Sequence, residues 1–196
     1  MTDTINQASF ESHSNETGLL EIQIPTVFSD KNTLLLTVAN ESVNTSQIAD
    51  YAHLEGFDVK TAYHLTVIGD AVGKRLQEKL EAIVNDSEKT VLLNSVNSLT
   101  SILGKAKLKP GHYYRLLKVF DYDGMPEQRE SIIQEVEIEG INDFYSRFSQ
   151  LTGIELGTPF PHITLFTKGN SEQSKKGIGV RSIEYLNMIQ HQRIQL

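Results

Sequence analysis

The stretch FPHITLF, residues 160–166, decides how this sequence is interpreted. Its apolar residues predict a buried strand, yet His162 and Thr164 interrupt them with polar side chains. Side chains two residues apart on a strand point to the same face of the sheet. The stretch therefore predicts a strand that buries Ile163 and Leu165 on one face and presents a polar pair on the other.

A second stretch, AYHLTVIGD at residues 62–70, repeats this pattern. When the histidines are aligned, His64 matches His162 and Thr66 matches Thr164, and a glycine turn follows each motif, at Gly69 and at Gly169. One such pair alone is typical of a hydrogen-bonded structural histidine beside a good strand former. Two pairs in matching context favour two halves of one site.

Strand and helix patterns alternate along the rest of the chain, with no linker long enough to divide it. We therefore predict a disordered polar tail at 1–18 and a single α+β domain at 19–196. Further strands are expected at 19–28, 32–40 and 112–122, while 178–196 starts as a strand and forms a sheet edge, and a flexible loop is expected at 169–177. Helices are expected at 45–57, 73–84 and 140–153. The second has an apolar face of Leu76, Leu80, Ile83 and Val84, and the third one of Phe144, Phe148 and Leu151. Residues 126–137 look helical, or like a helix running into a strand, and 90–104 fit either a helix or a strand and turn.

Composition excludes several classes of protein. The 196 residues include no cysteine, so disulfides, zinc fingers and thiol nucleophiles are excluded. The net charge of −7 argues against broad binding to a nucleic-acid backbone. No stretch approaches the ~18–20 apolar residues of a membrane span, and the N-terminus lacks the features of a signal peptide. We expect a cytoplasmic monomer that needs no cofactor and forms no stable complex with nucleic acid or membrane.

Two histidines that face one cleft can act as a general base and a general acid in the same reaction. One takes a proton from an attacking hydroxyl or water, and the other gives a proton to the leaving oxygen. Phosphodiesters suit this arrangement, because hydroxyl donors such as Thr66 and Thr164 could hold the non-bridging oxygens. No acidic residue lies at ligand spacing beside either motif except Asp70 past the turn, so we predict no metal.

The segments HLTV at 64–67 and HITL at 162–165 resemble the paired His-x-Thr motifs of the two-histidine (2H) phosphoesterase superfamily, which includes LigT-like RNA 2′–5′ ligases and cyclic nucleotide phosphodiesterases. The resemblance implies a pseudo-symmetric bilobal α+β fold with antiparallel sheets around a central cleft. It also implies a hydrolase that cleaves 2′,3′-cyclic phosphates, cyclic oligonucleotides or 2′–5′ linkages without a metal. His64 and His162 would be the catalytic pair, with Thr66 and Thr164 binding the substrate phosphate.

Secondary candidates come from a basic stretch, KAKLKPGHYYRLLKVF at 105–120. If it lines a cleft, Tyr113 and Arg115 could contact a nucleotide or RNA-end substrate, as could Lys168 after the second motif. The same stretch is also typical of the charged solvent face of an edge strand. GDAVGKR at 69–75 imitates a phosphate-binding loop, but its glycine spacing is wrong for one.

Three functions stay open at this point. The first is the phosphodiesterase, or an RNA 2′–5′ ligase running the same chemistry in reverse. The second is a non-catalytic module that holds a phosphate or an RNA end, and the third is a structural protein with coincidental motifs. The two half-sites are nearly equivalent in sequence, so the pattern does not assign which histidine is the acid and which the base.

Overall fold

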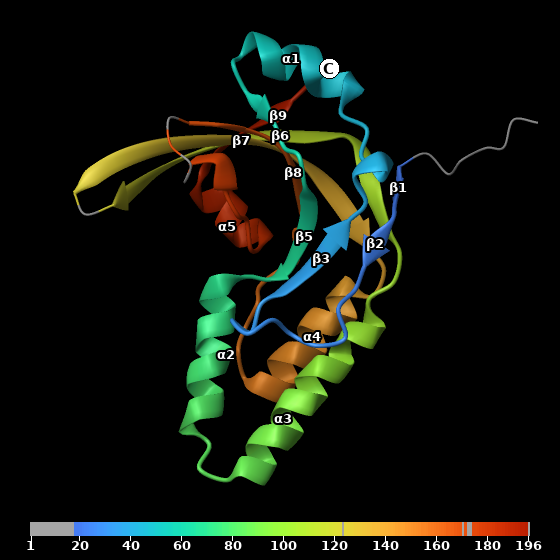
Figure 1. Ribbon diagram of the computed structural model, residues 1–196, viewed down its shortest axis with the longest axis vertical. Helices are drawn as coiled ribbons and strands as arrows, with labels where there is room; N and C mark the ends of the chain where they lie inside the picture. The colour runs from blue at the N-terminus through green and yellow to red at the C-terminus, as the bar shows by residue number, and fades with distance from the viewer. Residues whose placement is uncertain (1–17, 123, 170, 172–173, 196) are drawn as a thin grey trace, which may run out of the picture.

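The structure, a computed structural model, describes residues 18–122, 124–169, 171 and 174–195. Most of the expected disordered tail lies outside these residues. Strands and helices are mixed along the described chain, so the fold class is α+β, as predicted (Figure 1). The α-helices within it are α1 (Ser46–Leu54), α2 (Asp70–Ala82), α3 (Asp86–Ser98), α4 (Ile141–Thr152) and α5 (Ile183–Met188).

The described strands form one curved, antiparallel sheet in the order β1-β6-β7-β8-β5-β3-β2, with β4 added to β8 and β9 to β6. The segments β1 and β2 follow each other in sequence yet pair with opposite ends of this order, so the sheet is nearly closed. The strands are β1 (Leu19–Leu20), β2 (Ile22–Gln23), β3 (Leu34–Val38), β4 (Asp58–Val59), β5 (Tyr63–Ile68), β6 (Ala106–Tyr122), β7 (Met125–Ile138), β8 (His162–Lys168) and β9 (Gln190–Ile194).

The main hydrophobic core lies on one face of this sheet, where α2, α3 and α4 lie side by side (Figure 1). Fully buried Leu76 of α2, Val96 of α3 and Phe148 of α4 meet the inward side chains of β3, β5 and β8 there. A smaller cluster on the other face packs α5 and the segment before it against β6 and β7. Thus one face of β5 and β8 is buried in the main core, and the other face lies near the second cluster.

Two of the expected helices are confirmed with altered buried stripes. On α4, Phe144 and Phe148 are buried as predicted, but Leu151 is 41% exposed and Tyr145 is buried instead. A 3.6-residue period explains the difference, since a stripe through 141, 144, 145, 148 and 152 leaves 151 at its edge. On α2 the helix ends at residue 82, so Val84 is exposed.

The helical interpretation of 126–137 is wrong, because this segment is the central part of β7. Its neighbours β6 and β8 pair with both of its edges, and residues 129–134 are buried. Glu and Gln favour a helix in isolation, but pairing on both edges and burial of the β-branched Ile132, Ile133 and Val136 favour a strand.

The structure also settles the remaining segments. Residues 86–98 of the ambiguous stretch form α3, whose first turn is capped by the Asn85 side chain accepting from the amides of Ser87 and Glu88. The expected strand at the C-terminus divides into α5 and the edge strand β9. Part of the expected loop at 169–177 lies outside the described residues, and the rest includes one short 3₁₀ turn at Ser174–Lys176. No helix among the described residues has the length and apolarity needed to cross a membrane.

Candidate functional site

The two His-x-Thr motifs lie on strands that are adjacent and antiparallel. Strand β5 pairs with β8 through Leu65 and Ile163, the central residues of the two motifs. Both side chains are fully buried in the main core. Because strand side chains alternate, the residues on either side of this pair must point to the opposite face.

The same register brings the four polar motif side chains together on that opposite face. An antiparallel pair centred on residues 65 and 163 sets Thr66 opposite His162, and His64 opposite Thr164. Each histidine therefore has a threonine from the other motif across from it. The two rings are close enough that the charge of His64 lowers the pKa of His162.

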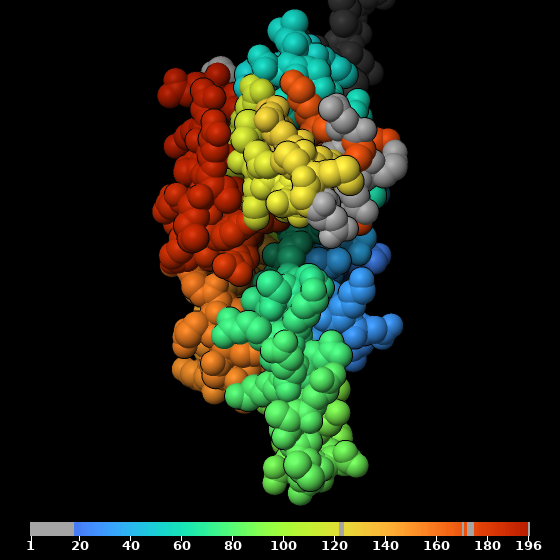
Figure 2. All heavy atoms as spheres, turned by 90° about the vertical axis from the view of Figure 1, so that its left-hand side faces the viewer, coloured from blue at the N-terminus to red at the C-terminus, as the bar shows by residue number. Residues whose placement is uncertain are grey.

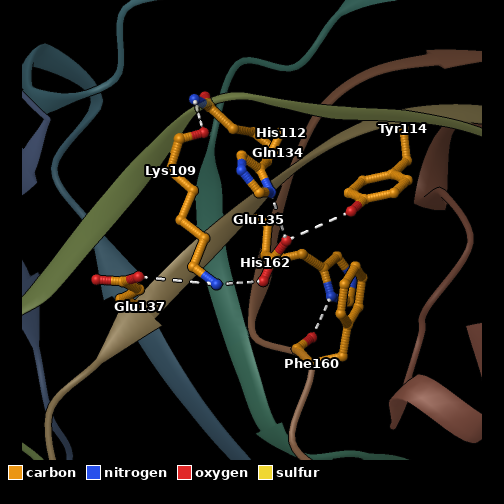
Figure 3. Close-up of polar contacts among 8 residues, drawn as sticks. All are labelled: Lys109, His112, Tyr114, Gln134, Glu135, Glu137, Phe160 and His162. Carbon is orange, nitrogen blue, oxygen red and sulfur yellow. Dashed lines mark hydrogen bonds and ion pairs between the residues drawn. The ribbon is translucent and has the colours of Figure 1, made fainter. Parts of the chain in front are cut away.

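His162 is the buried member of the pair, with 7% of its surface exposed. Its Nδ1 lies 2.9 Å from the carbonyl oxygen of Phe160, and its ring stacks on the Phe160 ring (Figure 3). Since a carbonyl only accepts, Nδ1 must carry the proton, which leaves the lone pair of the neutral ring on Nε2. Burial lowers the pKa of His162, the Phe160 carbonyl partly opposes this, and His64 lowers it further.

His64 is the exposed member of the pair. Partial desolvation lowers the pKa of His64, and the positive charge of Lys60 adds to this effect. Both histidines are thus held toward their neutral forms in the absence of an anion, but only His64 has open access to protons from solvent. The motifs are alike in sequence, and the fold gives their histidines different surroundings.

The two threonines also differ in their surroundings. Thr66 is exposed and lies near the start of α2, whereas Thr164 is half-buried under the segment that precedes α5. Gly177 packs directly on Thr164, since a Cβ at that position would lie 3.2 Å from the Thr164 methyl group. Figure 2 shows a hollow bordered by α2, the C-terminal segment and the β6–β7 hairpin, with residues of β5 deep inside it.

A carboxylate that sequence reasoning missed lies beside His162. Glu135 of β7 is the direct cross-strand neighbour of His162. It accepts hydrogen bonds from Lys109 Nζ (2.5 Å) and Tyr114 Oη (3.4 Å), and His112 Nδ1 lies 3.1 Å from it (Figure 3). These contacts fix Glu135 at the edge of the site. A helix, or a helix running into a strand, was expected over 126–137, so the alternation of Glu135 with Ile133 on one strand face was not recognised.

The three expected substrate contacts, Tyr113, Arg115 and Lys168, do not lie with the histidines. Tyr113 is buried in the main core, where its hydroxyl donates to Oε1 of Gln47 at 3.2 Å. Arg115 follows Tyr114, which is paired with Ile133 on the histidine face, so Arg115 points to the opposite side of the sheet. On β8 a bulge between Thr164 and Phe166 shifts the alternation, so Lys168, paired with Glu130, also points to that side.

Arg115 and Lys168 instead tie α1 to the sheet. Arg115 forms ion pairs with Glu130 (2.6 Å) and Glu55 (2.8 Å), and Lys168 donates to the backbone carbonyl of Glu55 at 2.7 Å. Both cations also lie over the ring of Phe57. These contacts hold both side chains against α1 and the sheet, so Arg115 and Lys168 have structural partners on this side.

No group of three or more His, Asp or Glu side chains is arranged to hold a metal in the part of the chain that the structure describes. Comparisons with known proteins found no matching family model, no matching curated protein and no matching solved structure. The interpretation of this site therefore depends on its own residues.

The buried histidine makes the stability of the fold depend on pH. Because folding lowers the pKa of His162, the unfolded chain binds more protons at and below about pH 6.5, and the free energy of unfolding should fall as pH decreases through that value. Urea unfolding between pH 7.5 and 5.5 measures this fall, and H162N should reduce it, because the amide can still donate to Phe160 but does not titrate.

His191 offers a matched control for this experiment. Its Nδ1 lies 3.1 Å from the carbonyl of Ile189, the same two-residue contact, but its side chain is exposed. H191N should keep the pH dependence of the unsubstituted protein. An equal reduction in both variants would show that burial of His162 is not the cause.

Proposed function

We propose that this protein is a metal-independent phosphoesterase of the two-histidine type that cleaves nucleotide phosphodiesters, 2′,3′-cyclic phosphates in particular. The observation that carries the proposal is the antiparallel pairing of the two motifs at Leu65 and Ile163. Two similar strand units related in this way, each with a helix next to it, are what a pseudo-symmetric bilobal fold would contain. A structural role for the motifs would not require two polar pairs on one shared face.

The surroundings of the histidines support a division of roles. His162 has its lone pair on Nε2 and a lowered pKa, so it suits the general base. When Nε2 takes a proton, the Phe160 carbonyl stabilises the resulting imidazolium through Nδ1. His64 is open to solvent, and a phosphate anion bound beside it would favour its protonated form, so it suits the general acid.

The proposed reaction on a 2′,3′-cyclic phosphate balances without a further reactant. His162 removes a proton from water, whose oxygen bonds to phosphorus. The bond from phosphorus to one ribose oxygen breaks, and His64 gives that oxygen a proton. Thr66 and Thr164 donate hydrogen bonds to the non-bridging oxygens, where negative charge must be held in the transition state. A ribose hydroxyl in place of water would open the same cyclic phosphate to a phosphodiester, which is ligation.

The experiment is incubation with 2′,3′-cyclic nucleotides, cyclic dinucleotides and 2′–5′ linked oligomers in excess EDTA, with products followed by ³¹P NMR. We expect conversion of at least one cyclic phosphate to a monophosphate. The protein with both histidines replaced by alanine provides the background rate. Equal rates for the two proteins would overturn the proposal, and tight nucleotide binding without turnover would favour the non-catalytic binding module.

A further inference from the structure

A pocket opens beside the first motif, separate from the histidines themselves. It has a volume of about 240 Å³, roughly the space of eight water molecules. Its wall combines the end of β5, the first turn of α2, one side of α4 and the segment that leads into α5. Residues that line it include Thr66, Val72, Tyr145, Leu156, Gly179, Arg181 and Tyr185.

The pocket shares one residue with the proposed catalytic face. Thr66 lines the pocket, and the register of β5 and β8 sets the same residue opposite His162. A phosphate held by the Thr66 hydroxyl would therefore lie at the mouth of the pocket. The group attached to that phosphate is the part of a substrate that could enter.

The chemistry of the walls favours a flat, largely apolar group. Val72, Tyr145 and Leu156 are all buried in the fold and present apolar surface to the pocket. The hydroxyl of Tyr145 donates to the carbonyl of Val67 at 3.2 Å, so this ring is fixed in place. The pocket is thus a preformed, apolar space of the kind that binds small ligands.

One cation, the exposed Arg181, lines the pocket. The guanidinium of Arg181 lies over the ring of Tyr185, 5.0 Å from its centre. The Tyr185 hydroxyl in turn accepts a hydrogen bond from Lys118. Arg181 is exposed and forms no ion pair among the described residues, so its charge is available to a ligand. A planar guanidinium can stack on a nucleobase or pair with a phosphate.

We propose that this pocket binds a nucleobase of the substrate. The base belongs to the nucleoside that carries the phosphate lying between the histidines. This inference rests on the proposed function and adds the place where the substrate is recognised through its base. The volume holds a single base. The site should therefore select a mononucleotide or the terminal nucleotide of a chain.

The test measures equilibrium binding, which needs no turnover. Calorimetry compares adenosine 3′-monophosphate with methyl riboside 3-phosphate, which has the same phosphate and sugar but no base. We expect the unsubstituted protein to bind the nucleotide at least about tenfold more tightly, in line with the usual effect of base stacking. Equal affinity for the two compounds would overturn the proposal.

Gly179 allows the pocket to be filled without strain. A Cβ at this position would meet no atom within 4 Å, and the residue lines the pocket. G179W should reduce the preference for the nucleotide to about twofold or less, and G179L, a smaller change, should reduce it in part. M188W is the matched control, because Met188 of α5 is 77% exposed and does not line the pocket.

The outcomes separate this inference from the proposed function. An unchanged preference in both Gly179 variants would place the base elsewhere, even if the unsubstituted protein cleaves cyclic phosphates. A preference that G179W and G179L remove, in a protein without cleavage activity, would support the pocket and reject the catalytic role. If G179W does not fold, as judged by circular dichroism, the result for G179L decides.

Discussion

Alanine in place of His162 should lower kcat for 2′,3′-cyclic nucleotide cleavage by about 10²–10⁴-fold, the usual contribution of a general acid or base. The substitution removes Nε2, whose lone pair can accept a proton because Nδ1 donates its hydrogen to the Phe160 carbonyl. Since His162 is buried behind the phosphate site, KM should change much less than kcat. The measurement is steady-state kinetics in EDTA as a function of pH, and the acid-side limb of the profile should disappear in H162A.

H64A should cause a loss of similar size, because the leaving oxygen would then depart without a proton. The doubly substituted protein should be little worse than either single variant, since two groups that act in one step are not additive. H191A is the control and should retain full activity, because His191 is exposed on the edge strand β9. Full activity in both H64A and H162A would reject the two-histidine mechanism.

Alanine in place of Phe148 should lower the free energy of unfolding by about 3–5 kcal/mol, as expected when a fully buried phenylalanine is truncated. The Phe148 ring stacks on Phe28 at 6.4 Å and on Phe144 at 6.2 Å, so the substitution leaves a cavity between α4 and the chain before β3. Urea unfolding followed by circular dichroism measures the change.

The matched control lies on the same helix. Leu151 is 41% exposed, so L151A removes a similar apolar side chain from the edge of the core and should cost less than about 1 kcal/mol. Similar losses in F148A and L151A would show that α4 does not face the core as described. The pair therefore tests the buried stripe of this helix directly.

Much of the local structure could be predicted, because local patterns carry it. The alternation in HLTV and HITL predicted two strands with a polar pair on one face, and β5 and β8 confirm it. The 3.6-residue pattern of α2 predicted its burial through Leu76 and Leu80. Such patterns hold because neighbouring residues alone determine which side of a strand or helix a side chain occupies.

The predictions that failed depend on which segments meet. Residues 126–137 have helix-favouring Glu and Gln, but β6 and β8 pair with both edges of this segment and make it a central strand. Arg115 looked like a cation for a substrate, but Glu55, directly after α1, and Glu130 of β7 lie within ion-pair distance of it. No local pattern predicts a partner 60 residues away in the chain.

The sequence by itself determined that His64 and Thr66 share a face, and likewise His162 and Thr164, because a period of two is a property of any strand. Only the tertiary structure decided that the two motifs pair with each other and that their histidines differ. Strand β8 lies between β5 and β7, and Phe160 turns back onto the His162 ring, so that histidine is buried. His64 remains exposed because burial is set by segments distant in sequence.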